Sequence, residues 1–137
     1  MFKWKNRIAI FVILLGTAGL AGCGGGGSEP QSGIPLPAKT LSWAPPNAYT
    51  DGTPLNPVAE LDSFEIYVKE SGPFTGSDNP LALVGAVNPS TGQLVTTFNL
   101  ANLAPYINLG VPYQVCLKAV AITGAKSGFS APATFSF

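Results

Sequence analysis

Two cysteines and seven carboxylates are the residues most able to do chemistry in this chain of 137 residues, because it contains no histidine. Histidine is the commonest general base and metal ligand, so its absence excludes Ser-His-Asp and Cys-His catalysis and histidine-based metal sites. Cys116 follows Val115 in a segment of alternating apolar and polar residues, which places its thiol on the outer face of a strand. We expect a half-covered, inert thiol without an intrachain disulfide; pairing between chains stays open.

The carboxylates do not form a recognisable catalytic or metal-binding pattern. Four acids crowd one short segment from Glu60 to Glu70, whereas glycosidases use a carboxylate pair that flanks a cleft. Asp51, Asp78 and Asn79 lie in turn-forming stretches, where such side chains usually bond their own backbone, and no Ca²⁺-binding loop spacing is present. A hydrolase is therefore the least expected function, and we expect no metal and no cofactor.

Aromatic residues offer a third kind of chemistry, because rings can stack on ligands such as sugars. Alternation turns Trp43, Phe64 and Tyr113 inward, where buried aromatics supply much of a small core. The aromatics expected to be exposed are Tyr67, on an outer strand face, and four loop residues, Tyr49, Phe74, Tyr106 and Phe129. A cluster of these would indicate a binding surface.

The first 22 residues have the layout of a secretory signal peptide. Bulky apolar and basic side chains alternate over Met1 to Arg7, the apolar run IAIFVILL covers Ile8 to Leu15, and small residues follow. A membrane-spanning helix is the alternative, but it needs about 20 predominantly apolar residues, and the second half of this stretch is mostly Gly, Ala and Thr.

The end of this segment, Leu20-Ala21-Gly22-Cys23, resembles the lipobox of bacterial lipoproteins. The resemblance implies cleavage before Cys23 and acylation of this cysteine. Palmitate is one of the fatty acids expected in its lipid. Several acyl chains anchor a protein stably to a membrane. An ordinary secreted protein with a cysteine there is the alternative. Gly24 in place of Asp resembles lipoproteins exported to the outer membrane, where the bacterium has one.

The chain divides into three parts: a lipoprotein signal peptide (1–22), a Gly/Ser/Pro-rich tether with the lipidated Cys23 (23–33) and one domain (34–137). Three of the seven bases lie before residue 8, leaving four lysines against seven acids. A net negative domain without a basic face makes nucleic acid an unexpected partner.

The domain is expected to be all-β. Apolar and polar residues alternate over Leu41–Trp43, Phe64–Lys69 and Tyr113–Ala119, and Gly/Pro/Asn clusters separate these runs. Such spacing favours a sandwich or barrel. The expected core contains Trp43, Phe64, Ile66, Leu103, Tyr113 and Val115.

Five motifs in this order resemble fibronectin type III domains, which implies an immunoglobulin-like sandwich of about seven strands. They are Leu41-Ser42-Trp43-Ala44-Pro45-Pro46 (strand B), Phe64-Glu65-Ile66-Tyr67 (C), Phe98 to Pro105 (E and the E–F corner), Tyr113 to Ala119 (F) and Ser127 to Pro132 (entry to G).

The sequence departs from this pattern between Leu103 and Tyr113, where Tyr106–Gly110 form an apparent insertion. Such sandwiches have a tyrosine corner, in which the Tyr hydroxyl bonds upstream backbone. We expect Tyr113 to keep this bond, since lengthening a loop by four residues adds only a few tenths of a kcal/mol in closure entropy.

The expected function is a non-enzymatic interaction or structural module, displayed on the cell envelope by its lipid. Its partners would be membrane lipid through Cys23 and a protein that the sequence does not identify. The alternative is a module that binds a glycan or another ligand through its loop aromatics.

Overall fold

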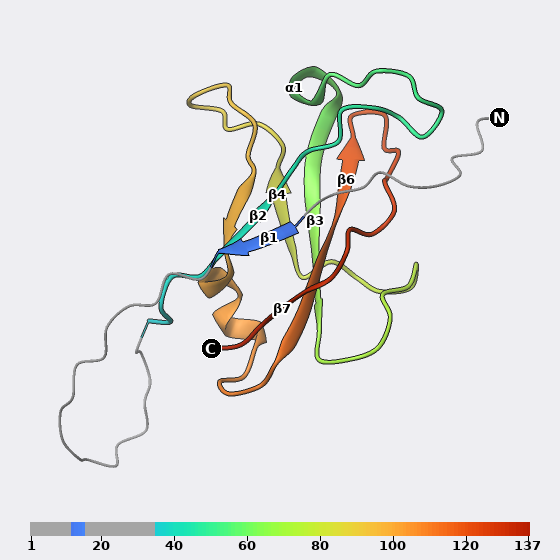
Figure 1. The fold of residues 1–137 in the computed structure, drawn as a ribbon. Coiled ribbons are helices and arrows are strands. Elements are labelled where there is room, and N and C mark those ends of the chain that lie inside the picture. Colours follow the sequence, from blue (N-terminus) through green and yellow to red (C-terminus); the bar gives the residue numbers. More distant parts are fainter. Residues whose placement is uncertain (1–11, 16–34) are drawn as a thin grey trace, which may run out of the picture.

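The computed structural model describes residues 12–15 and 35–137, and almost all regular structure in them is β (Figure 1). The strands form two antiparallel sheets. The first sheet has the order β1-β2-β5 and comprises β1 (Val12–Leu15), β2 (Thr40–Trp43) and β5 (Thr97–Asn99). The second has the order β4-β3-β6-β7 and comprises β4 (Ala82–Gly85), β3 (Leu61–Lys69), β6 (Tyr113–Ala121) and β7 (Ala133–Phe135). The expectation of an all-β fold is confirmed.

Both sheets contribute to one hydrophobic core. Leu41 and Trp43 enter it from β2, while Phe64 enters from β3 and packs edge-on against Trp43 with ring centroids 5.1 Å apart. The six residues expected in the core are all buried: Trp43, Phe64, Ile66, Leu103, Tyr113 and Val115. The indole Nε1 of Trp43 is buried without a hydrogen-bond partner among the described residues.

Two short helices connect the strands. Helix α1 (Pro57–Glu60) begins at Asn56, whose side chain accepts a hydrogen bond from the Val58 N–H. The Glu60 carboxylate in turn accepts from the Asn56 N–H (2.6 Å), so the two residues cap the helix reciprocally. The second helix is the 3₁₀ helix η1 (Leu100–Tyr106), which follows β5 and buries Leu100 and Leu103.

The loop after η1 is tied to β6 by Tyr113. The Tyr113 hydroxyl accepts a hydrogen bond from the Asn108 N–H at 2.9 Å, within the segment that the sequence marks as an insertion. The bond expected for this tyrosine is therefore present, and the inserted segment itself supplies the backbone partner.

The strand count differs from the expectation in one respect. Only six strands lie within 35–137, whereas about seven were expected after the tether. The seventh, β1, comes from the apolar run expected to be part of the signal peptide, and it pairs with β2. The last strand, β7, starts at Ala133, directly after the Ser127–Pro132 motif that was expected to lead into it.

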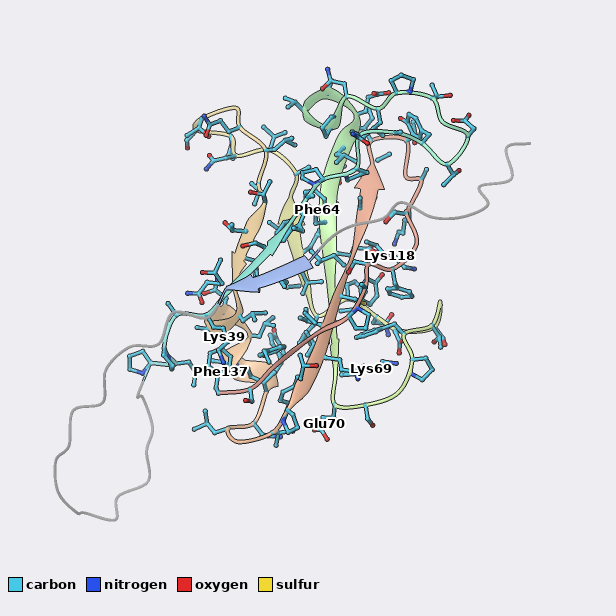
Figure 2. The ribbon with its side chains drawn as sticks, viewed as in Figure 1. Lys39, Phe64, Lys69, Glu70, Lys118 and Phe137 are labelled. Atoms are coloured by element: carbon cyan, nitrogen blue, oxygen red, sulfur yellow. The ribbon has the colours of Figure 1, made fainter. Side chains whose placement is uncertain are left out.

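The start of β2 and the last residues of the chain lie together. The Lys39 ammonium donates to the Ser136 carbonyl and lies 5.1 Å from the centroid of the Phe137 ring (Figure 2). The Gly110 N–H donates to the Phe137 carbonyl (2.7 Å), which brings the loop after η1 to the same place. We call this place the Lys39 end of the domain.

Candidate functional site

The charged, aromatic and thiol side chains most able to bind or react gather on the outer face of the second sheet. Phe64, Ile66 and Val115 enter the core, so the alternation of β3 and β6 turns Glu65, Tyr67 and Lys118 outward. The register pairs Glu65 with Lys118 and Tyr67 with Cys116 across the two strands. Side chains of such pairs lie on one face and touch.

A segment from further along the chain covers this outer face. Ser127 and Ser130 bind it to β6, because each donates its N–H to a β6 carbonyl and accepts a β6 N–H through its hydroxyl. The hydroxyl acceptors replace the carbonyls that a regular strand would offer to Leu117 and Ala119, at 2.9 Å in both cases. This irregular pairing leaves Phe129, between the two serines, against the outer face.

Three rings and two lysines make up the covered region, which we call the Phe129 cluster. The Phe129 ring packs edge-on against Tyr67, with centroids 4.9 Å apart, and lies 5.6 Å from Phe74. The Lys118 ammonium lies 4.0 Å from the Phe129 centroid and 5.6 Å from that of Tyr67. Lys69 lies 5.0 Å from the Phe74 centroid and forms a 2.9 Å ion pair with Asp78. Figure 2 shows Lys69 and Lys118 on the same side of the molecule, away from Lys39.

Glu65 is the charged residue at the base of this cluster, and only 6% of it is exposed. Its carboxylate accepts hydrogen bonds from the Tyr67 hydroxyl and the Lys126 ammonium, both at 2.6 Å. Burial raises the pKa of Glu65, but the bonds from Lys126 and Tyr67 and the charges of Lys126 and Lys118 outweigh it, so the net pKa lies below its ordinary 4.5. Burial and the bond to Glu65 raise the pKa of Tyr67 well above 10.0. The pair therefore consists of a carboxylate and a neutral phenol at neutral pH.

Cys116 lies beneath the same cluster and is completely buried, so the expectation of a half-covered thiol is wrong. Burial raises its pKa to about 12, and the nearby positive charges of Lys118 and Lys69 do not offset this effect. Nucleophilic and redox reactions need an accessible thiolate. Pairing of Cys116 between chains is disfavoured for the same reason.

The structure brings together three of the five aromatics expected to be exposed. Tyr67, Phe74 and Phe129 meet in the cluster, but Tyr67 is only 3% exposed, and its assignment as an exposed aromatic is wrong. The misassignment arises because segments distant in sequence cover its correctly predicted outward face. Tyr49 is half-buried and donates its hydroxyl hydrogen to Glu60 (3.0 Å). Tyr106 is 64% exposed at the end of η1.

The pairing of Glu65 with Tyr67 and Lys126 was missed in the sequence. Glu65 and Tyr67 are two residues apart on one strand and thus on one face, a signal that the alternation contains. Lys126 could not be found in this way, because it lies 61 residues away in sequence.

The carboxylates and the lipobox complete the expected sites. Within the described ranges 12–15 and 35–137, no three or more Cys, Asp or Glu side chains are grouped as a metal site would need. Asp51 instead accepts from the Thr53 N–H (2.8 Å), a bond that lowers its pKa. The lipobox residues Leu20, Ala21, Gly22 and Cys23 lie outside the described residues. No helix in the described part is long and apolar enough to span a membrane.

The sequence matches no family model and no curated protein. Among solved structures, the crystal structure of the pectate lyase PelI from Erwinia chrysanthemi is similar, with 15% sequence identity and a TM-score of 0.49. The similarity covers 95% of this chain and 28% of that chain, so this chain spans less than a third of the pectate lyase's length. At this identity and TM-score, the likeness carries no argument about fold family or activity.

Proposed function

We propose that the chain is an exported lipoprotein whose folded domain acts as an interaction module at the cell envelope. The observation that carries this proposal is Leu20-Ala21-Gly22-Cys23 directly after the basic and apolar segments of a signal peptide. Cleavage before Cys23 and its acylation would anchor the domain to a membrane through the tether 24–33. The destination is the outer membrane, where the bacterium has one.

We further propose that the domain belongs among immunoglobulin-like sandwiches of the fibronectin type III kind. In immunoglobulin-like sandwiches, strands B and E share one sheet, and strands C, F and G share the other. Here β2 pairs with β5, and β6 lies between β3 and β7. These pairings, and the Tyr113 bond in the place of a tyrosine corner, support the assignment made from the five motifs.

An interaction surface for a protein fits the Phe129 cluster better than a sugar platform does. A sugar needs an open ring face on which to stack, yet Lys118 already lies over the Phe129 ring and Lys69 over the Phe74 ring. Half-buried aromatics are enriched at protein interfaces, and the lysines would belong to the polar rim that surrounds the buried part of such an interface. The proposal assigns no catalytic role to any residue.

Metabolic labelling with radioactive palmitate tests the lipid anchor. The wild-type protein and the Cys116→Ser variant should incorporate label and fractionate with membranes, whereas Cys23→Ser should not. Cys116→Ser is the matched control because it removes the other cysteine of the chain. Label retained in Cys23→Ser, or absent from the wild type, would contradict the proposal.

A further inference from the structure

Within 12–15 and 35–137, the strand that occupies the outer edge of β2 is β1. The Trp43 N–H donates to the Thr96 carbonyl, and the Lys39 carbonyl accepts from the Leu100 N–H, so residues 39, 41 and 43 direct their backbone groups toward β5 and its flanks. Alternate residues of a strand bond to opposite neighbours. Thr40 and Ser42 therefore direct their N–H and C=O groups toward β1, where the register sets Leu15 against Thr40 and Ile13 against Ser42.

This edge carries no protection against pairing. Exposed edge strands usually contain lysine, proline or a bulge, which discourage the addition of another strand. The sequence Thr-Leu-Ser-Trp of β2 has neither residue, and its pairing with β1 and β5 runs without a register shift. The edge is thus suited to a permanent partner strand.

The chain after Cys23 is poorly suited to replace β1. Residues 24–33 read GGGGSEPQSG, which lacks the apolar and β-branched residues typical of strands. Residues 35–39 form no strand in the structure, and Pro35 and Pro37 have no N–H to donate. Cleavage before Cys23 would remove Val12–Leu15 and leave the edge open.

We propose that the processed protein accepts at this edge an uncharged, apolar strand of a partner polypeptide, antiparallel to β2, in the place that β1 holds in the precursor. This inference rests on the proposed function, because it requires removal of residues 1–22. The chemistry of the partner strand follows from the segment that occupies the edge, Val-Ile-Leu-Leu. Backbone bonding would supply affinity, as in other cases of strand addition.

Amide hydrogen exchange tests whether the edge of β2 becomes open when residues 1–22 are removed. An introduced protease site makes this test independent of natural processing. A protease site is placed within 24–33 of the full-length Cys23→Ser variant, which is folded whole, cut and freed of its N-terminal piece. The Thr40 and Ser42 amides should then exchange faster by about 100-fold or more. The Leu41 amide, which is directed toward β5, should stay protected and is the internal control.

A synthetic peptide of residues 3–16 serves as the probe strand, with its own basic residues for solubility. It should restore protection of Thr40 and Ser42, while the same peptide with Ile13→Pro should not, because proline removes the N–H opposite Ser42. Unchanged protection after cutting, loss of Leu41 protection, or no effect of the peptide would overturn the inference. A dimer protected without peptide would assign the edge to a second copy and would also overturn it. The N-terminal mass of the protein isolated from cells reports separately on the proposed cleavage.

Discussion

Glu65 is the residue whose charge should govern the acid stability of the domain. Its pKa is lowered in the folded state, so its contribution is fully present above its ordinary pKa of 4.5 and is lost as pH falls through the folded value. We expect Glu65→Gln to destabilise the domain by about 1–3 kcal/mol at neutral pH, since it removes the negative charge that accepts the hydrogen bond from the Lys126 ammonium. Urea unfolding at a series of pH values should show this difference shrinking below about pH 4.5.

Glu70→Gln is the matched control for this experiment, because Glu70 is exposed just after β3 (Figure 2). Its effect should stay within about 0.5 kcal/mol. If the difference in the free energy of unfolding between Glu65→Gln and the wild type stayed constant down to the lowest pH, the charge of Glu65 would not contribute as described.

Cys116 should be unreactive until the protein unfolds. In the Cys23→Ser variant it is the remaining thiol of the chain. Ellman's reagent at about pH 8 should not react with the native protein, because the buried thiol is inaccessible and protonated. Full reaction is expected in guanidinium chloride, and rapid reaction of the native protein would contradict the burial.

Tyr113→Phe removes a single hydrogen bond and keeps the ring. The partner, the N–H of the exposed Asn108, can turn to water when the hydroxyl is lost. We therefore expect a loss of about 0.5–1.5 kcal/mol, the net value of one such bond. Urea midpoints should report it at equal slopes, and Tyr106→Phe, on an exposed ring, should change nothing measurable.

At the level of elements, the serine-mediated attachment of 127–130 to β6 is the least regular pairing and the easiest to test. Ser130→Ala leaves the buried Leu117 N–H without its acceptor, at a cost of about 1–3 kcal/mol. Ser130→Thr keeps the hydroxyl and should recover most of the loss. The free energy of unfolding of both variants is compared with that of the wild type, and Ser71→Ala, at an exposed position, is the control. An unchanged free energy of unfolding in Ser130→Ala would show that water replaces the hydroxyl.

The elements also show how far sequence reasoning reaches. Alternation predicts β2, β3 and β6 well, because each turns one apolar face into the core and spans at least four residues. The three-residue β7 is too short to show alternation, and its place was expected instead from the Ser127–Pro132 motif, which ends directly before it. The burial of Tyr67 and the place of β1 depend on segments far apart in sequence, about which local patterns carry no information.

For the whole molecule, the shared core predicts a single cooperative unfolding transition. Trp43 of the first sheet packs against Phe64 of the second, so neither sheet can keep its buried face alone. In a Trp4→Phe background, the fluorescence of Trp43 and the far-ultraviolet circular dichroism should give coincident urea curves. Separate midpoints would show that one sheet unfolds before the other.

The Lys39 end gives the proposed lipoprotein a direction. The tether would join the domain there, next to Phe137 and the loop that carries Leu109, which is 67% exposed. A fluorescent protein fused after Phe137 would then lie close to the tether, whereas α1, at the other end of the domain in Figure 1, would lie farther from it. Reporter tags intended to leave the membrane side undisturbed therefore belong in the loop before α1, at the exposed Asp51–Gly52 turn.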